Sequence, residues 1–176
     1  DAMDIEGLGP AVVAQLLEKG LIANVADLYE LHAQEVVQLD RMGVKSAENL
    51  IRAIEKSKAN DLGKLIYGLG IRQVGEKAAA VLAQHFGSLD ALCAASVEEL
   101  TAIPDVGEIT ARCIVSYLNQ PQAKDLIARL KAAGVNMEST VQKVDDRFAG
   151  MTFVLTGTLS RLDRKTAEAE IALRGG

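Results

Sequence analysis

A five-residue pattern of apolar and polar positions occurs four times along the chain. In each copy an apolar residue is followed by two variable positions, a second apolar residue and a glycine. The copies are Ile5–Gly9, Leu39–Gly43, Ile71–Gly75 and Ile103–Gly107, numbered here as hairpins one to four. Their terminal glycines are 34, 32 and 32 residues apart. A fixed period of this length is typical of one supersecondary unit that is repeated.

Each copy predicts a tight hairpin that leads into a helix. A compact residue stands four positions after the glycine and an apolar residue three positions further, which is the period of a buried helix face. These pairs are Val13 and Leu16, Ala47 and Leu50, Ala79 and Leu82, and Ala111 and Ile114. We expect the two apolar residues of the pattern to anchor the hairpin and the final glycine to let the backbone turn into the helix. The free N–H groups at the helix start would then form a site for an anion such as phosphate.

The same periodicity, together with capping signals, predicts helices between the hairpins. Asn24 is the expected cap of one of them, and Ser96 with Glu99 forms a capping box before hairpin four. The predicted helices are Pro10 to Lys19, Val25 to Leu31, Ala33 to Gln38, Val44 to Lys58, Leu62 to Leu69, Ala78 to Phe86 and Gln122 to Ala133. After a polar segment, the period changes to a β-run at Met151 to Leu155, and a helix follows from about Lys165 to Leu173.

A longer repeat contains the short one. Seven residues from Leu28 to Ala47 match seven residues from Leu92 to Ala111 at a spacing of 64. Hairpins one and two therefore form one pair, and hairpins three and four form another. Two hairpins related by an approximate twofold axis can contact the two strands of a duplex, because the phosphate strands are related by such an axis themselves.

The repeated pattern resembles the helix-hairpin-helix motif, which binds the DNA backbone without reading its sequence. Four motifs in tandem resemble the corresponding domain of bacterial NAD-dependent DNA ligases. The most specific matches, in the order of that family, are AMDIEGLG, GVKSAENL, LGIRQVG and FVLTGTL. The resemblance implies a mainly α fold with two pseudo-twofold pairs of hairpins, followed by a truncated α/β segment.

The resemblance also implies a division of the chain and a function. Residues 1–135 would form the DNA-binding domain, 136–147 a linker and 148–176 the first part of a BRCT domain, with Thr156 and Gly157 at its phosphate-pocket position. The parent protein would seal nicks in replication and repair with NAD and a divalent metal, Mg²⁺, and would carry Zn²⁺ in a four-cysteine module upstream. None of those cysteines is present. The chain opens almost directly on hairpin one, without the full helix that should precede it, so we expect its start to be a cut within the parent protein.

The share of the function expected here is a grip on nicked duplex DNA through its phosphates. The candidate DNA-binding residues are the hairpin glycines and the basic residues beside them: Gly7, Gly9, Arg41, Gly43, Lys45, Arg72, Gly75, Lys77, Gly107 and Arg112. Hairpins two and three should provide most of the ionic affinity, because Arg41 with Lys45 and Arg72 with Lys77 flank them. Phosphate contacts fix position and carry no base information.

Composition limits this picture. The formal net charge is −5, which is the wrong sign for a bulk DNA binder, so any DNA-binding face must be local. Cys93 and Cys113 have no partner at metal-ligand spacing and are expected to be buried free thiols in a reducing compartment. No catalytic residue, metal site or cofactor of its own is predicted, since the Lys-x-Asp-Gly sequence of the ligase nucleophile does not occur. The chain is expected to be monomeric and cytoplasmic, with no membrane partner.

Two other functions stay open on the sequence alone. The hairpins could pack against protein in a non-catalytic scaffold or interaction module. A DNA glycosylase would place an aspartate after one hairpin, and Asp125 lies 18 residues after Gly107. Such an enzyme flips a base into an aromatic pocket. This chain has three Tyr, three Phe and no Trp, so the glycosylase is the less favoured of the two.

Overall fold

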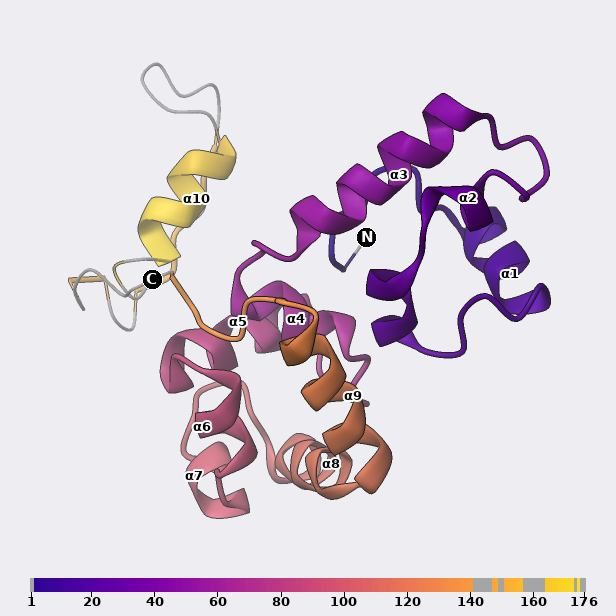
Figure 1. Ribbon diagram of the computed structural model, residues 1–176. Coiled ribbons are helices and arrows are strands. Elements are labelled where there is room, and N and C mark those ends of the chain that lie inside the picture. Colours follow the sequence, from indigo (N-terminus) through magenta and orange to yellow (C-terminus); the bar gives the residue numbers. More distant parts are fainter. Residues whose placement is uncertain (1, 141–146, 149–150, 157–163, 173, 175–176) are drawn as a thin grey trace.

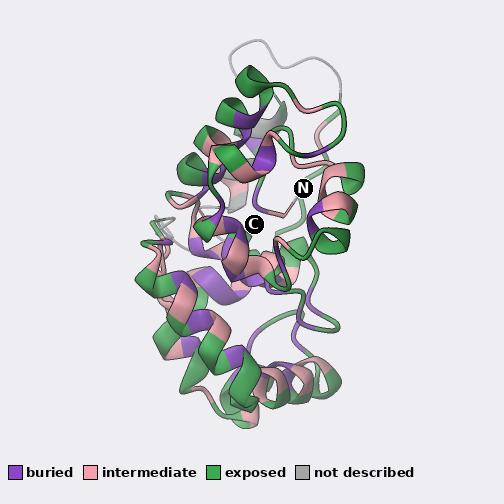
Figure 2. Cartoon of the chain, turned by 45° about the vertical axis from the view of Figure 1, so that its right-hand side comes forward, coloured by how far each residue is buried: buried purple, intermediate pink, exposed green. Residues whose placement is uncertain are grey.

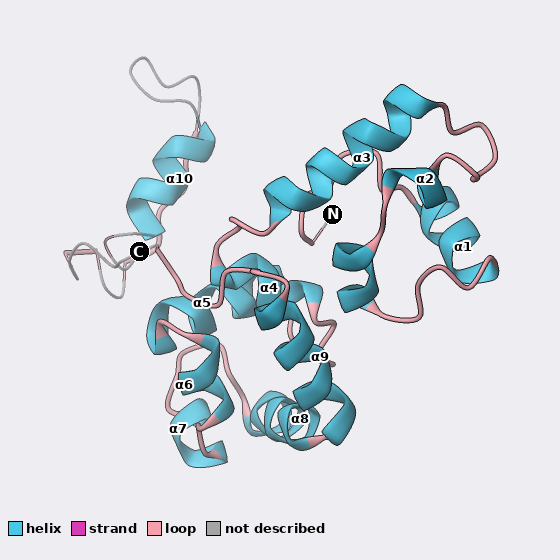
Figure 3. Ribbon diagram, in the orientation of Figure 1, coloured by secondary structure: helices cyan, strands magenta, loops and turns pink. Residues whose placement is uncertain are grey.

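The computed structural model describes residues 2–140, 147–148, 151–156, 164–172 and 174. Over these ranges the fold is mainly α, as predicted, with ten α-helices and one 3₁₀ helix (Figures 1 and 3). The elements are α1 (Pro10–Glu18), η1 (Val25–Glu30), α2 (Ala33–Val36), α3 (Val44–Ser57), α4 (Leu62–Gly68), α5 (Glu76–Phe86), α6 (Leu89–Cys93), α7 (Val97–Thr101), α8 (Glu108–Asn119), α9 (Pro121–Ala132) and α10 (Arg164–Ala172).

The helices predicted from the sequence are present with small changes of length. Asn24 caps η1 by accepting from the Ala26 N–H at 2.9 Å, and Ser96 with Glu99 forms the predicted capping box of α7. Helix α5 begins at Glu76, two residues before the predicted start. Helix α6 was not predicted. Ser88 caps it by accepting from the Ala91 N–H at 3.2 Å, and a serine at this position is a sequence signal for a helix start.

Two hydrophobic cores divide the hairpins as the 64-residue repeat predicts. One core joins hairpins one and two, with Leu16, Val36 and Leu50 at its centre. The other core joins hairpins three and four around residues such as Leu82 and Ile114. Figure 2 shows buried residues on helices in both parts of the molecule. Matching positions of the repeat are therefore buried in the core of each pair.

An ion-pair cluster fastens the two pairs to each other. The Arg129 guanidinium on α9 lies 2.6 Å from a carboxylate oxygen of Asp27 and 2.9 Å from one of Glu30, both on η1. The Ala23 N–H and the Arg129 guanidinium donate to Asp27 and hold the pKa of this carboxyl below its ordinary value. The first pair is thus attached to the last helix of the second pair (Figure 1).

The first five residues of the predicted linker are bonded to the helical part. The Asn136 N–H donates to the Lys58 carbonyl at 2.8 Å, and the Ser139 N–H donates to the Gly87 carbonyl at 2.8 Å. The Thr140 N–H donates to the Asp61 carboxylate at 2.7 Å. Residues 136–140 therefore extend the packing of the helical part along α4 and α6.

Near the C-terminal end one prediction is confirmed and one is wrong. Helix α10 matches the helix predicted from Lys165 to Leu173. The predicted β-run at Met151 to Leu155 is not a strand, since residues 151–156 carry no regular secondary structure. A strand needs a neighbour to take up its backbone hydrogen bonds, and the described parts of the chain offer none. Gly157, Thr158 and the final glycine pair lie outside the described residues.

The prediction of a buried thiol at Cys93 is also wrong. Cys93 is exposed and Cys113 is half-buried, and both are free. Cys93 ends α6, whose Leu89 and Leu92 face the core. The residue after Leu92 is turned by about 100° away from that face.

Asp61 provides a test of how residues 139–140 are held. Burial raises the pKa of Asp61, but hydrogen bonds from Thr140, Gly63 and Ser139 outweigh burial and leave it below its ordinary value. A lowered folded-state pKa gives stability that is present above the unfolded value of about 4 and is lost as the pH falls through the folded value. We expect Asp61→Asn to cost about 1 kcal/mol at pH 7 and to flatten the acid side of the stability profile.

Urea unfolding at pH 7 and at stepwise lower pH measures this. Asp125→Asn is the matched control, because Asp125 is exposed and has no hydrogen-bond partner among the described residues. Equal acid sensitivity of both variants and the unsubstituted chain would contradict the assignment.

Candidate nucleic-acid interface

All four hairpins close with the same backbone hydrogen bond. The N–H of the second apolar residue donates to the carbonyl of the first. The distances are 3.2 Å from Leu8 to Ile5, 3.2 Å from Met42 to Leu39, 3.0 Å from Val74 to Ile71 and 3.1 Å from Val106 to Ile103. The sequence pattern thus corresponds to one repeated backbone geometry.

The residue before the second apolar position turns each hairpin. It has a left-handed backbone in every copy, with φ of 84° at Gly7, 61° at Arg41, 69° at Gln73 and 66° at Asp105. Only the first of these is glycine, and the left-handed region costs other residues about 1–2 kcal/mol. The expectation that the terminal glycine makes the turn is therefore wrong. Its φ is −87°, −84°, −85° and −78° in the four copies, which any residue can adopt.

The terminal glycines instead serve as helix N-caps. Gly9, Gly43, Gly75 and Gly107 accept the first helical hydrogen bond of α1, α3, α5 and α8 at 2.9–3.0 Å. No side chain caps these helix starts. A Cβ atom added at any of the four would meet no atom within 4 Å. Neither backbone angle nor packing therefore requires glycine here, and its effect is to leave the first N–H groups of each helix open to solvent.

The hairpins differ in how firmly they are anchored. In hairpins three and four both apolar residues are buried, with Ile71, Val74, Ile103 and Val106 at most 6% exposed. Hairpin two buries Leu39 and half-buries Met42, and hairpin one buries neither Ile5 nor Leu8 fully. The helix starts that follow hairpins three and four are the most rigidly placed.

Comparisons with known proteins identify this arrangement. Residues 1–56 match the family described as SAM-like helix-hairpin-helix tandem, and residues 64–127 match the helix-hairpin-helix motif. The chain is 60% identical over 175 residues to a DNA ligase of Carboxydothermus hydrogenoformans and 47% identical over 182 residues to one of Bacillus subtilis. These alignments cover 99% and 100% of the chain but 26% and 27% of the two relatives. The chain is a helix-hairpin-helix segment of the bacterial DNA ligase family.

The basic residues predicted beside the hairpins of this ligase segment fall into two groups. Arg41, Lys45 and Arg72 are exposed and take part in no ion pair within the described ranges. Lys77 lies 3.5 Å from Asp105 across hairpins three and four, and Arg112 lies 2.5 Å from Glu108. Internal carboxylates therefore neutralise part of the charge at the second pair. Of the four residues expected to concentrate the ionic affinity at hairpins two and three, Lys77 is the one with an ion-pair partner among the described residues.

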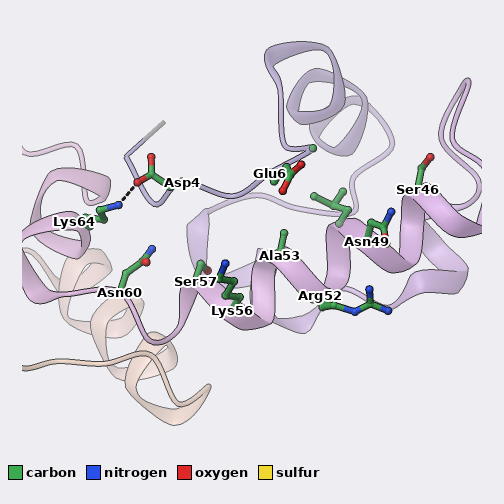
Figure 4. A pocket seen from close by; sticks show the side chains of 12 residues that line it. Asp4, Glu6, Ser46, Asn49, Arg52, Ala53, Lys56, Ser57, Asn60 and Lys64 are labelled. Carbon is green, nitrogen blue, oxygen red and sulfur yellow. Dashed lines mark hydrogen bonds and ion pairs between the residues drawn. The ribbon is translucent and has the colours of Figure 1, made fainter. Parts of the chain in front are cut away.

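The same part of the ligase segment contains two further basic residues that the hairpin pattern did not predict. Arg52 and Lys56 line a groove of about 690 Å³ between α3 and the segment that leads into hairpin one (Figure 4). Their positions, seven and eleven residues after Lys45, were a readable helical signal.

The described ranges contain neither a metal-binding cluster nor a membrane span. No three His, Cys, Asp or Glu side chains lie close enough there to hold a metal ion. None of the helices combines the length and apolar character that a bilayer span requires.

Gln73 tests the geometry of the turn. We expect Gln73→Gly to stabilise the fold by about 0.5–1 kcal/mol, because glycine removes the left-handed strain at φ 69°. The higher conformational entropy of glycine in the unfolded chain offsets part of this stabilisation. Chemical unfolding of the purified chain measures the change. Arg72→Gly, one residue earlier and outside the left-handed set, should destabilise it instead. A loss of stability in Gln73→Gly would show that its side chain contributes more than the turn costs.

Asp105 tests the internal neutralisation. Asp105→Asn keeps a residue that tolerates the left-handed backbone and removes the carboxylate beside Lys77. If Lys77 is then free to contact a phosphate, the slope of log K against log salt for duplex DNA should steepen by up to about 0.9. Asp90→Asn changes the same charge beside Lys131, away from the hairpins, and should leave the slope unchanged. Equal slopes for the two variants would exclude Lys77 from the interface.

Proposed function

We propose that this chain binds duplex DNA through its backbone phosphates, without sequence specificity, as the DNA-gripping part of an NAD-dependent ligase that seals nicks in replication and repair. The observation that carries the proposal is the glycine N-cap shared by all four hairpin helices. Each leaves backbone N–H groups uncapped beneath open space. A phosphate can approach such groups closely and gains from the helix dipole.

The paired architecture supports contact with both strands of the duplex. Each core holds two hairpins, so each pair presents two helix starts from one rigid unit. An approximate twofold relation between the hairpins of a pair suits the twofold relation between phosphate strands. The ligand of this proposal is nicked duplex DNA and the chain acts as a monomer.

The remaining parts of the ligase are proposals about the parent protein. NAD, Mg²⁺ and Zn²⁺ would be bound by other segments of it, because this sequence contains no Lys-x-Asp-Gly nucleophile and only two cysteines. Residues 1–135 would be the DNA-binding domain, 136–147 the connection and 148–176 the beginning of a BRCT domain. We place the parent in the cytoplasm, where it would act on chromosomal DNA.

Gly43→Ser separates this function from folding. Serine is a better N-cap than a residue without a side-chain acceptor, and open space surrounds Gly43, so the melting temperature should hold or rise. The serine oxygen would accept a hydrogen bond from the backbone N–H groups that we propose bind phosphate. Duplex affinity at fixed salt should therefore fall about tenfold, or about 1.4 kcal/mol.

Fluorescence anisotropy with a nicked and an intact duplex measures the affinity. Gln120→Ser is the matched control, because Gln120 is the N-cap residue of α9, makes no side-chain capping hydrogen bond and belongs to no hairpin. If Gly43→Ser and Gln120→Ser bind DNA equally well, the hairpin helix starts do not hold phosphates, and the scaffold function becomes the better explanation.

A further inference from the structure

Three basic side chains form a straight stripe along α3. Lys45, Arg52 and Lys56 are spaced by seven and four residues. At 3.6 residues per turn, all three lie within about 40° of one another around the helix axis. The stripe begins at Lys45, the second residue of α3 and two positions after Gly43 of hairpin two. It therefore continues the predicted phosphate site of that hairpin along the helix.

The stripe carries unneutralised charge. All three side chains are exposed and have no hydrogen bond or ion pair with the described residues. Most other basic side chains there are engaged, for example Lys58 by Glu55 at 2.8 Å and Lys131 by Asp90 at 3.2 Å. Of the two acidic residues that flank the stripe on α3, Glu55 is held by Lys58, and Glu48 forms no ion pair with Arg52. The positive charge of the stripe is thus available to a ligand.

The second hairpin pair shows that folding does not require this stripe. Helix α8 is the counterpart of α3 at a spacing of 64. Where packing determines the residue, the two helices agree, with Leu50 matching Ile114 and Ala47 matching Ala111, all buried. At the positions that match the stripe stand Ile109 and Ser116 of α8 and Gln120, the residue that follows its last turn. The charges on α3 are therefore an addition to the repeated unit.

A groove beside the stripe supplies further donors. Ser46 and Asn49 line it together with Arg52 and Lys56, and Figure 4 shows these side chains along one helix. Across the groove lie Asp4 and Glu6 from the N-terminal segment. Asp4 is ion-paired with Lys64, which leaves Glu6 as the acidic group facing the basic side. The excess is positive on the α3 side.

We propose that α3 is a second phosphate-binding element, in which Arg52 and Lys56 hold the DNA backbone beyond the phosphate taken by hairpin two. The ligand class is the phosphodiester backbone of a duplex. Lys45 to Lys56 spans about 16 Å along the helix axis, which equals about five base pairs at 3.4 Å per phosphate on one strand. This proposal rests on the proposed function and adds two contacts to it.

The test compares salt dependence among variants of the whole 176-residue chain. Arg52→Gln with Lys56→Gln should lower the slope of log K against log salt by about 1.8, which is the loss of two phosphate contacts. Lys124→Gln with Lys131→Gln removes the same charge from α9 and should change the slope by much less. Arg52→Lys with Lys56→Arg keeps both charges and should retain the slope. Circular dichroism confirms that each variant keeps its helices.

The outcomes separate this inference from the function on which it rests. If the Arg52 and Lys56 variant behaves like the α9 control while Gly43→Ser still weakens binding, the second element is wrong and the hairpin function stands. If the unsubstituted chain shows no salt-dependent binding, both fail. If the α3 variant loses slope and Gly43→Ser does not, α3 is supported and the hairpin site is overturned.

Discussion

The structure depends on how each hairpin is anchored. Two apolar side chains enter the core on either side of one left-handed residue, and a single hydrogen bond between their backbones closes the turn. This fixes the direction of the following helix and hence of its first N–H groups. Where the anchors are fully buried, the fold tolerates Gln73 and Asp105 in the left-handed position. Hairpin two, in which Met42 is half-buried, also has a non-glycine residue there, Arg41. Hairpin one has two half-buried anchors and uses Gly7, which adopts that backbone without strain.

Much of this fold is readable from sequence because packing leaves a periodic trace. The pattern located all four hairpins, and the 64-residue repeat predicted which of them share a core. The pattern could not say which position makes the turn. The final glycine was expected to let the backbone turn, yet Gly43 has φ −84° and the non-glycine Arg41 has φ 61°. The sequence shows where a glycine stands. It does not show whether glycine is needed for a left-handed backbone or to let a ligand approach the backbone N–H groups.

The candidate site was less readable because charge pairing is a property of three dimensions. Lys77 and Asp105 are far apart in the sequence and lie 3.5 Å apart in the fold. Arg52 and Lys56 lie nine and thirteen residues after Gly43, outside the hairpin pattern that indicates the other basic candidates. The strand expected at Met151 to Leu155 was inferred from local composition. Strand formation also requires a neighbouring strand to accept and donate its backbone hydrogen bonds, and a local sequence pattern does not show whether one is present.

The acidic composition and a DNA-binding role are compatible because many carboxylates already bind backbone N–H groups. The Asp27 carboxylate accepts from Ala23 at 2.7 Å, Glu35 from His32 at 2.9 Å, and Glu99 from Ser96 at 2.8 Å. These acceptors lie at the starts of helices that do not follow a hairpin. The four helices that do follow one have glycine caps and no side-chain acceptor. Carboxylates therefore occupy the anion-binding helix starts that the fold uses internally, while the starts at the hairpins are left for an external anion. The net charge of −5 counts all these carboxylates alike. At the hairpins, the first turns of α1 and α3 contain no acidic residue, whereas those of α5 and α8 contain Glu76 and Glu108.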